Sequence, residues 1–586
     1  MRFDIRQDEQ EFDQAMRNAD IAELFREMAE LLELEDANPF RVRAYRTAAA
    51  TVEELSTPVS QLIEDGADLT ELRGIGDDLA ASLREIVATG SFEDLDTLRE
   101  SSTATLRALL QIPGLGPKRV QALHAHLGIA SIEDLERSLA SGEIDDVPGF
   151  GRKTIQNLQE TLLAGRRKKE RRLWADVEGE ALALEEFIQG IEGAEQGRVG
   201  GSFRRRRETV ADLDVVVSSS SPDGVIGRFV EYGQIGRILS QGSTRASVLL
   251  ESGLPVDLRV VEPESWGSAL MYFTGSRDHQ LRLRDMAIDN GWKLNEYGLF
   301  DGDERLAGST EEEVYRQFGL EYIEPELRES RGEIDAARSG KLPELVALED
   351  LRGDAHVYSS SGGGRQDIRS LAQAASERGY GYFVIADRVS EDQAKDALTL
   401  ERLCDLCEEI ARINDDLGSV TLLAGAEIDV LEDGSPAIDP ADLGELDLII
   451  WNIAGNRDLS REKQTTRLLR ALDHPACQAL AHLTGRIVNE REPADFDVER
   501  VLSAARDAAC AIEIDGNPRR LDLPDRYCQI ARDIGTKLIV TSRADRIEDL
   551  GHIRHAVDQA RRGWLESRDV LNTRSVNDFL SGVRSG

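Results

Sequence analysis

The chain has 586 residues, and its 110 acidic side chains outnumber its 71 lysines and arginines, which gives a formal net charge of −39 at pH 7. The length corresponds to several domains at roughly 100–200 residues each, and 40% hydrophobic with 31% charged residues excludes a disordered chain. No segment approaches the roughly 18 apolar residues of a membrane span, Met1–Asp20 is too acidic for a signal peptide, and five scattered cysteines suggest no disulfide framework. We therefore expect a multidomain cytoplasmic protein with no membrane contact.

The basic residues are almost all arginine, because only nine are lysine and 71 − 9 = 62 are arginine. A dense carboxylate surface with little lysine keeps a protein soluble in concentrated salt, where charges are screened within about 3 Å at 1 M. We prefer a halophilic source. An ordinary acidic protein from a genome rich in arginine codons is the alternative.

The acidic excess also argues against nucleic acid, since phosphate contacts normally dominate that affinity. The charge is uneven, however. Residues 1–100 carry 10 basic and 25 acidic side chains, whereas residues 101–210 carry 17 and 16. A DNA contact is therefore most plausible in the second segment, although a charge run is often only a solvated face.

Residues 20–66 are expected to be helical, because apolar side chains recur at helical spacing from Ile21 onward. Asn38 and Pro39 supply a break and a cap before the next helix. Three similar units then follow, each with an apolar residue, a Gly-x-Gly turn and the start of a helix: Leu72–Leu79, Ile112–Val120 and Val147–Ile155.

These three units resemble the helix-hairpin-helix motif, whose glycines let main-chain amides at a helix start face a phosphate. Glycine turns also join ordinary helices, but three copies in one register favour DNA-backbone binding. In the first unit Asp77 and Asp78 stand where a basic residue would help, so a structural role is nearly as plausible there. The candidate DNA-binding residues are Gly74, Gly76, Gly114, Gly116, Lys118, Gly149, Gly151 and Lys153.

From about residue 174 the pattern changes to mixed α/β. Strands are expected at 210–217, 246–250 and 255–261 with helices around them, and residues 263–325 alternate helix with short strand-like pieces. A charged stretch over 324–347 leads to a second block with strand-like runs before helices, which suggests a barrel-like or wound domain. These runs cover 382–386, 422–426, 447–450, 510–514 and 537–541.

The chemistry is expected around a glycine turn, Gly200-Gly201-Ser202, and the pair Asp212-Leu213-Asp214. Residues two apart on a strand share a face, and pairing of neighbouring strands would bring Asp257 alongside. Three clustered carboxylates repel one another unless cations neutralise them, so we expect divalent metal ions and phosphoryl transfer. Three unrelated exposed aspartates are the alternative.

Together with Gly267–Ser276, this series resembles the nucleotidyltransferase fold of the family X DNA polymerases. Asn38–Tyr45 and the hairpin units are similar to the bacterial and archaeal branch, in which a C-terminal PHP (polymerase and histidinol phosphatase) domain follows, so the resemblance covers essentially the whole chain. It implies a helical N-terminal domain with the first hairpin (1–100), a two-hairpin DNA-binding domain (101–172), a nucleotidyltransferase palm (173–262), a nucleotide-selection thumb subdomain (263–325), a linker (326–350) and a PHP-type α/β barrel (351–586).

The resemblance implies a DNA-directed DNA polymerase that fills short gaps in repair, including base excision repair, as a monomer. Its substrates would be gapped or primed double-stranded DNA and deoxynucleoside triphosphates, with two Mg²⁺, or Mn²⁺ in their place, as cofactors. Asp212 and Asp214 would bind both metals, and Asp257 would lie near the primer 3′-hydroxyl. Gly201, Ser202 and Arg205 would bind the nucleotide at its β- and γ-phosphates, and Tyr272, Phe273 and Gly275 would line the sugar. Gln280 stands where relatives carry an Asn that contacts the base edge. Arg284 would lie at the template minor groove.

Two activities of the family are expected to be missing. The position of the lyase lysine holds Ser82, and residues 1–117 contain no lysine, so a Schiff base at a 5′-deoxyribose phosphate lacks its amine. The PHP metal motifs are also eroded: Tyr358 stands where a histidine ligand is expected, and Arg388 and Arg543 replace a histidine and an aspartate. The residual ligands are His356, Asp387, Glu427 and His482, so PHP-bound Zn²⁺ or Mn²⁺ and its nuclease activity are not expected.

Two rival functions stay open. One is a polymerase with residual 3′–5′ exonuclease or phosphoesterase activity in the PHP domain, and the other is a non-enzymatic hairpin-based DNA-binding scaffold, which would predict loss of the aspartates. Cys404 and Cys407 could suggest zinc, but no second pair or nearby histidine completes four ligands. At helical spacing this pair is interpreted as a packing feature.

Overall fold

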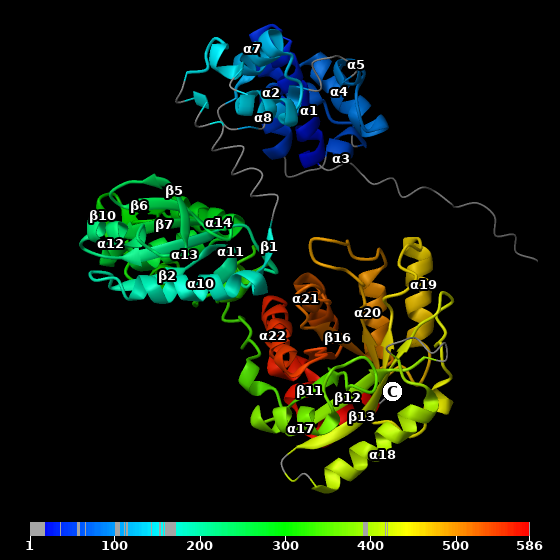
Figure 1. Ribbon diagram of the computed structural model, residues 1–586. Coiled ribbons are helices and arrows are strands. Elements are labelled where there is room, and N and C mark those ends of the chain that lie inside the picture. Colours follow the sequence, from blue (N-terminus) through cyan, green and yellow to red (C-terminus); the bar gives the residue numbers. More distant parts are fainter. Residues whose placement is uncertain are drawn as a thin grey trace, which may run out of the picture. The chain divides into compact units, whose positions relative to one another are not determined.

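The computed structural model describes residues 18–35, 37–54, 59–64, 66–99, 106–110, 112, 115–141, 143–151, 154–155, 158, 171–390, 397–416, 418 and 420–584. The chain divides into two compact units, Met1–Lys169 and Glu170–Gly586. Figure 1 colours the first unit blue to cyan and the second cyan to red. Within the described residues, no helix is long and apolar enough to span a membrane.

The first unit is helical, as the sequence predicts. In α1 (Asn18–Leu34), Ile21, Phe25, Met28 and Leu32 lie on one buried face because they recur every three or four residues. Asn38 caps the next helix, since its Oδ1 accepts a hydrogen bond from the Phe40 main-chain N–H at 2.9 Å. The other helices are α2 (Pro39–Glu54), α3 (Val59–Glu64), α4 (Asp77–Thr89), α5 (Glu93–Arg99), α6 (Arg107–Leu110), α7 (Pro117–Leu127) and α8 (Ile132–Ser141).

The second unit begins with a five-stranded sheet in the order β2-β4-β7-β6-β5, in which only β4 and β7 run parallel. The sequence predicts one strand over 210–217, but the chain forms two, because it bends at Ala211 and leaves Asp212 in neither strand. The prediction that Asp212 and Asp214 share a face of one strand is therefore wrong. This palm consists of β1 (Arg172–Leu173), α10 (Trp174–Gln189), β2 (Gln196–Val199), α11 (Gly201–Arg204), β3 (Thr209–Val210), β4 (Leu213–Ser218), α12 (Pro222–Phe229), β5 (Ile235–Gln241), β6 (Arg245–Leu250) and β7 (Pro255–Val261).

A subdomain of alternating helices and short strands follows the palm, as expected from residues 263–325. Its antiparallel strands have the order β10-β9-β8. His279 is fully buried there between Glu333, whose Oε1 lies 2.7 Å from Nδ1, and the Tyr315 hydroxyl, 2.9 Å from Nε2. The elements are α13 (Trp266–Thr274), α14 (Arg277–Asp289), β8 (Lys293–Asn295), β9 (Gly298–Asp301), β10 (Glu304–Ala307), α15 (Glu311–Gln317) and α16 (Glu333–Arg338). The predicted linker over 326–350 is wrong in its first part, because Ile334 and Ala337 of α16 pack into the core of this subdomain.

The C-terminal part is a seven-stranded parallel sheet in sequential order from β11 to β17. A parallel bridge between Val357 and Ala544 brings the first and last strands together, so the sheet nearly closes into a barrel. The strands are β11 (Gly353–Val357), β12 (Tyr382–Arg388), β13 (Thr421–Asp429), β14 (Leu448–Asn452), β15 (Ala479–Ala481), β16 (Ala511–Asp515) and β17 (Leu538–Thr541).

Helices surround the outside of these strands, as Figure 1 shows, and small apolar side chains such as Ala386 and Ala481 fill the inside. Helix α23 (Val576–Arg584) packs against this interior, where the Phe579 ring stacks on Tyr382 with centroids 4.9 Å apart. The outer helices are α17 (Ile368–Glu377), α18 (Leu400–Asp416), α19 (Arg461–Leu472), α20 (Val498–Asp507), α21 (Asp525–Ile534) and α22 (Ile553–Arg562). The C-terminal domain is therefore an α/β barrel of the PHP type.

Candidate active site

The palm brings two of the three predicted catalytic aspartates side by side. Strands β4 and β7 are parallel neighbours, and their register pairs Asp214 directly with Asp257. Asp212 precedes β4 and lies close enough to Asp214 to raise the pKa of its carboxyl group. The predicted pairing of neighbouring strands is therefore confirmed.

The glycine turn before α11 packs against the same aspartate. The Gly200 N–H donates to the Asp214 main-chain oxygen at 2.6 Å. Gly201 has a φ of +59°, and a Cβ placed there would lie 2.5 Å from Asp214 Oδ2. Any side chain at position 201 would displace this carboxylate, so both the conformation and the space require glycine.

Asp214 is electrostatically strained in the absence of cations. Its burial raises the pKa to about 7, and the negative charges of Asp212 and Asp257 add to the shift. Asp257 is exposed, and its Oδ1 accepts a hydrogen bond from the Ser247 hydroxyl. This donor set of hard oxygens suits divalent cations, although no three His, Cys, Asp or Glu side chains in the described residues are arranged as a ready metal site.

Phe273, one of the predicted pocket residues, lies beside this turn. A Cβ added to Gly200 would be only 3.2 Å from the Phe273 main-chain oxygen. Arg205 donates from Nη1 to the Thr274 main-chain oxygen at 2.5 Å and from Nε to Glu329 Oε1 at 3.0 Å. A Cβ on Gly275 would lie 3.0 Å from that same Nη1, so glycine leaves room for the guanidinium.

The other predicted pocket residues differ in exposure. Tyr272 is 38% exposed and packs edge-on against the half-buried Phe273, with ring centroids 5.2 Å apart. Ser202 is half-buried, and Arg284 is exposed on α14. Gln280 is buried, and its amide donates to the Met271 main-chain oxygen at 2.6 Å, which leaves only its Oε1 without a hydrogen bond.

The three hairpins, all within the compact part Met1–Lys169, share the same two main-chain hydrogen bonds. The main-chain oxygen of the apolar residue before each turn accepts a hydrogen bond from the N–H three residues later; for example, the Ile75 N–H donates to the Leu72 oxygen at 3.1 Å. The oxygen of the last glycine accepts from the first turn of the helix; for example, the Val120 N–H donates to the Gly116 oxygen at 3.1 Å. The third hairpin repeats both bonds: the Phe150 N–H donates to the Val147 oxygen, and the Ile155 N–H donates to the Gly151 oxygen. The predicted repetition is therefore confirmed.

The turn glycines that the structure describes differ in backbone conformation. Gly74 and Gly149 have φ values of +76° and +91°, which glycine adopts readily. Gly76 and Gly116 have ordinary φ values of −94° and −80°, are exposed, and would leave an added Cβ in open space. Within the described residues, no atom lies within 4 Å of a Cβ added at either position, so the fold itself leaves room for a side chain at both. Two other predicted contacts, Gly114 and Lys153, lie outside the described residues.

The first hairpin differs from the second in charge. Helix α4 opens with Asp77 and Asp78, whereas α7 opens with Pro117, Lys118 and Arg119. Ser82, at the position of the lyase lysine, donates its hydroxyl to the Asp78 main-chain oxygen at 3.1 Å.

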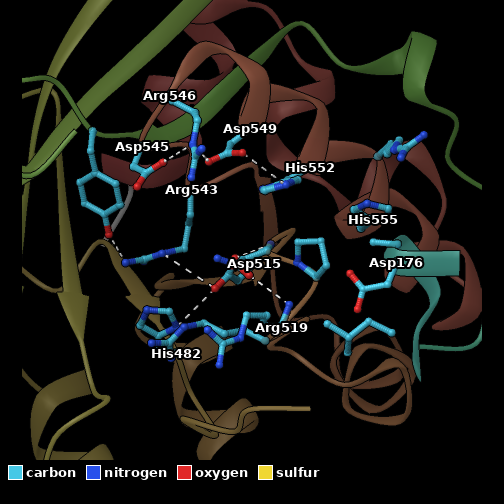
Figure 2. A pocket seen from close by; sticks show the side chains of 17 residues that line it. Asp176, His482, Asp515, Arg519, Arg543, Asp545, Arg546, Asp549, His552 and His555 are labelled. Carbon is cyan, nitrogen blue, oxygen red and sulfur yellow. Dashed lines mark hydrogen bonds and ion pairs between the residues drawn. The ribbon is translucent and has the colours of Figure 1, made fainter. Parts of the chain in front are cut away.

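At the mouth of the barrel, where the strands end, an arginine lies among the acidic side chains. Arg543 follows β17, and its Nη2 donates to Glu427 Oε2 at 2.8 Å while its Nη1 donates to Glu513 Oε2 at 3.1 Å. Its Nε lies 3.9 Å from Asp515 Oδ2. In Figure 2 a dashed line joins this side chain to Asp515, and another joins Asp515 to His482. The guanidinium is only 8% exposed.

His356 and Tyr358 complete this cluster. His356 Nδ1 lies 2.8 Å from Glu513 Oε1 and Nε2 lies 3.1 Å from Glu427 Oε2, while Tyr358 donates to Glu427 at 2.5 Å and accepts from Arg543. Burial alone would raise the pKa of Glu427 and Glu513, but Arg543 and His356 hold Glu427 well below its ordinary value and lower Glu513 to about 2. The two buried carboxylates are therefore paired with Arg543 and His356, two side chains of the chain itself.

The four residual ligands predicted from the sequence lie in one neighbourhood, since His482 is near enough to lower the pKa of Glu427 and His356 that of Asp387, but they do not all bond to one another. His356 and Glu427 are in contact, and His482 Nδ1 lies 3.5 Å from Asp515 Oδ2. Asp387 is engaged elsewhere, because it accepts hydrogen bonds from the Ser359 N–H at 2.6 Å and from its hydroxyl at 2.5 Å.

Glu513 and Asp515, on the predicted strand 510–514 and at its end, are not among the site residues expected from the sequence. Their spacing of two residues before Gly516 was the available signal, since alternate residues of a strand share a face. Cys404 is exposed on α18, and Cys407 packs partly against the core. Neither belongs to a group that could hold a metal within the described residues.

Comparison with known proteins matches three family models to this architecture. Residues 16–92 match "Helix-hairpin-helix domain", residues 106–162 match "SAM-like Helix-hairpin-helix tandem" and residues 269–329 match "DNA polymerase beta thumb". A Bacillus subtilis protein named DNA polymerase/3′-5′ exonuclease PolX is 32% identical over 567 residues, which cover 96% of this chain and 98% of the relative.

Eukaryotic relatives match a smaller part. DNA polymerase lambda of Arabidopsis thaliana is 24% identical over 53% of this chain and 62% of its own length. Human DNA-directed DNA/RNA polymerase mu is 24% identical over 49% of this chain and 64% of its own length.

The palm with its carboxylate pair, the thumb and the hairpins define a template-directed nucleotidyltransferase. The chain belongs to family X of the DNA polymerases, in the bacterial form that ends in a PHP barrel. It is a DNA-directed DNA polymerase, an enzyme class that acts on DNA and deoxynucleotides with divalent metals.

Proposed function

We propose that this polymerase fills short gaps in double-stranded DNA, with Asp212, Asp214 and Asp257 as its catalytic carboxylates. The observation that carries this proposal is the register of β4 and β7, which pairs Asp214 with Asp257. Gly201, held against the Asp214 carboxylate, supports the same site from the glycine turn. An arrangement this crowded is costly unless it holds cations.

The three aspartates would hold two divalent metal ions, Mg²⁺ or in its place Mn²⁺, which when bound would activate the primer 3′-hydroxyl and stabilise the leaving diphosphate. Asp212 and Asp214 would hold both ions. Asp257, exposed on β7, would face the primer terminus. A charge on Asp214 would be favoured by the bound cations, because its carboxyl in their absence has a pKa of about 7.

The incoming nucleotide would lie between the glycine turn and α13. Ser202 and Arg205 would bind the β- and γ-phosphates, since a guanidinium offers paired donors to phosphate oxygens. Tyr272, Phe273 and Gly275 would line the sugar. Gln280 would contact the base only through its buried Oε1 or after giving up its bond to Met271.

DNA would be held by the second and third hairpins through main-chain amides and basic side chains, with Arg284 on α14 at the template minor groove. The first hairpin would have mainly a structural role, because Asp77 and Asp78 repel phosphates. We propose repair synthesis by a monomer without 5′-deoxyribose phosphate lyase activity, since Ser82 offers no amine. We also propose that the polymerase is active in concentrated salt and is located in the cytoplasm.

We propose further that the PHP barrel has lost its metal-dependent nuclease, because Arg543 supplies the positive charge that its carboxylates need. Residual 3′–5′ exonuclease activity is the second candidate. It is favoured by the name of the B. subtilis relative, which includes that activity.

The test is extension of a gapped duplex by the full chain over a salt series, scored for lengthening and shortening of the primer. Lengthening should require a divalent metal and disappear in Asp212→Ala and Asp257→Ala. Asp223→Ala, at an exposed carboxylate of palm helix α12, is the matched control and should extend normally. Extension by Asp257→Ala at the wild-type rate would remove the mechanism, and binding without any extension would favour the scaffold.

A further inference from the structure

Helix α22 of the barrel carries a row of side chains that contact the polymerase part of the same unit. His555 contacts Trp174 edge-on with ring centroids 5.6 Å apart, and both residues are buried. Arg562, at the end of the helix, is the most deeply buried arginine of this row, because its side chain is only 1% exposed. The other contacts join Arg554 to Glu178, Gln559 to Glu208 and Arg561 to Glu326.

The Arg562 guanidinium binds three acceptors from different parts of the chain. Its Nη1 donates to the Arg205 main-chain oxygen at 2.6 Å and to Glu329 Oε1 at 3.1 Å. Its Nη2 donates to Asp525 Oδ2 at 2.6 Å. Burying a guanidinium is costly unless carboxylates pair with it, and the fork of arginine can serve several acceptors at once.

Glu329 is shared between this guanidinium and the arginine proposed to bind the triphosphate. The same Oε1 accepts from Arg205 Nε at 3.0 Å, and Oε2 lies 3.5 Å from Arg207 Nη1. Burial would raise the pKa of Glu329, but the charges of Arg562, Arg205 and Arg207 hold it below its ordinary value. Glu329 therefore stays an anion between the barrel and the palm.

A buried anion with several cationic partners can lose one of them at lower cost than an anion with a single partner. A turn of Arg205 toward the phosphates of a nucleotide would weaken the bond from its Nε to Glu329. Arg562 would keep Glu329 paired during that change. Its bond to the Arg205 main-chain oxygen would also keep the backbone of that residue in place.

We propose that Arg562, a residue of the barrel, is a positioning residue of the polymerase reaction that sets the orientation of Arg205 toward the nucleotide triphosphate. The proposal rests on the role proposed above for Arg205. It assigns the barrel a part in nucleotide binding that does not depend on nuclease activity. A merely structural role for Arg562 would instead affect folding without a specific effect on nucleotide affinity.

The test measures kcat and the KM for a deoxynucleoside triphosphate on a gapped duplex with the full chain. Arg562→Gln should raise the KM about tenfold, which corresponds to about 1.4 kcal/mol, with a smaller change in kcat. Arg562→Lys keeps the charge and should give an intermediate KM. Arg554→Ala removes a contact of the same helix with the palm and should leave the KM unchanged.

A second set of variants separates this proposal from the role of Arg205. Arg205→Ala should raise the KM. The double variant Arg205→Ala with Arg562→Gln should raise the KM no further, because Arg562 acts through Arg205. A normal KM in Arg205→Ala would overturn both proposals. A raised KM in Arg205→Ala with a normal KM in folded Arg562→Gln would overturn the positioning role alone, as would additive effects in the double variant. If melting curves show that Arg562→Gln does not fold, a KM of Arg562→Lys equal to that of the wild type overturns the proposal.

Discussion

Arg543 Nη2 donates to Glu427 Oε2 at 2.8 Å in the mouth of the PHP barrel, so a side chain of the protein pairs with a carboxylate that the family resemblance assigns to metal binding. The same guanidinium reaches Glu513, and His356 bridges the two glutamates. The barrel therefore satisfies its buried negative charge internally. Metal binding at this place would have to displace a bonded guanidinium.

Removing this guanidinium should destabilise the barrel and make its stability depend on metal. Arg543→Ala leaves Glu427 and Glu513 with only His356 as a buried cation, a loss expected to cost about 3–5 kcal/mol. Mn²⁺ or Zn²⁺ should then raise the melting temperature of Arg543→Ala. The measurement is made in an Asp257→Ala background, so that metals at the palm contribute less.

The parent of that experiment, Asp257→Ala with Arg543 intact, should gain less stability from these metals than the double variant and should not trim single-stranded DNA. Trimming from the 3′ end that requires metal and is abolished by His356→Ala would contradict the loss of the nuclease. It would favour the residual exonuclease instead.

The sequence was sufficient to predict the elements that depend on local pattern. The hairpin turns follow from glycine spacing, and the palm strand at 255–261 follows from its apolar run and forms β7 with the same bounds. The pairing of Asp214 with Asp257 was predicted only as a possibility of neighbouring strands, because the order of strands in a sheet is not contained in any one segment.

The charge networks could not be predicted for the same reason. Arg543 was identified as a cation in place of a ligand, but its contact with Glu513 depends on β17 lying beside β16. Arg562 carries no sequence signal of its contacts. Its contact with Glu329 joins segments far apart in the sequence, and no periodicity or spacing encodes such a contact.

Stability in acid should depend on Glu311 in the polymerase part. Its carboxylate accepts from Arg204 at 2.6 Å and from the fully buried Arg328 at 2.6 Å. Burial alone would raise the pKa of Glu311, but Arg328 and Arg204 lower it from 4.5 to about 2. Because the folded pKa is depressed, the stabilisation is present above about pH 4.5 and is lost as the pH falls toward 2.

A shift of this size corresponds to about 3 kcal/mol of unfolding free energy between pH 5 and pH 2. Glu311→Gln should be less stable at neutral pH and should lose less stability on acidification than the wild type. Glu312→Gln, at an exposed neighbour on α15, is the control. Denaturant unfolding at several pH values measures the difference, and parallel acid curves for wild type and Glu311→Gln would refute the assignment.

Sugar choice should favour deoxynucleotides, because the Tyr272–Phe273 main chain is expected to approach the 2′ position. The Phe273 oxygen already lies close to the glycine turn at Gly200. The ratio of kcat/KM for deoxy- and ribonucleotides under Mg²⁺ measures this preference. Equal incorporation of both sugars would count against it, and one human relative is in fact named a DNA/RNA polymerase.

The second and first hairpins should respond differently to the same small change. Gly116 and Gly76 both have ordinary φ values, and a Cβ at either position meets no atom within 4 Å. Gly116→Ala and Gly76→Ala should therefore leave the melting temperature nearly unchanged. Only the change at Gly116 should weaken DNA binding, because Lys118 attracts a phosphate to that turn whereas Asp77 repels one.

Binding is measured as the dissociation constant for a gapped duplex over a range of salt concentrations. Gly116→Ala should weaken binding at every salt concentration, because a methyl group holds the phosphate away from the main-chain amides. Lys118→Ala should in addition lower the slope of log affinity against log salt by about 1, as expected for the loss of one phosphate contact. Gly76→Ala should change neither quantity. Equal weakening by the two glycine substitutions would show that both hairpins bind DNA, and unchanged binding in Gly116→Ala would show that this turn does not contact the backbone.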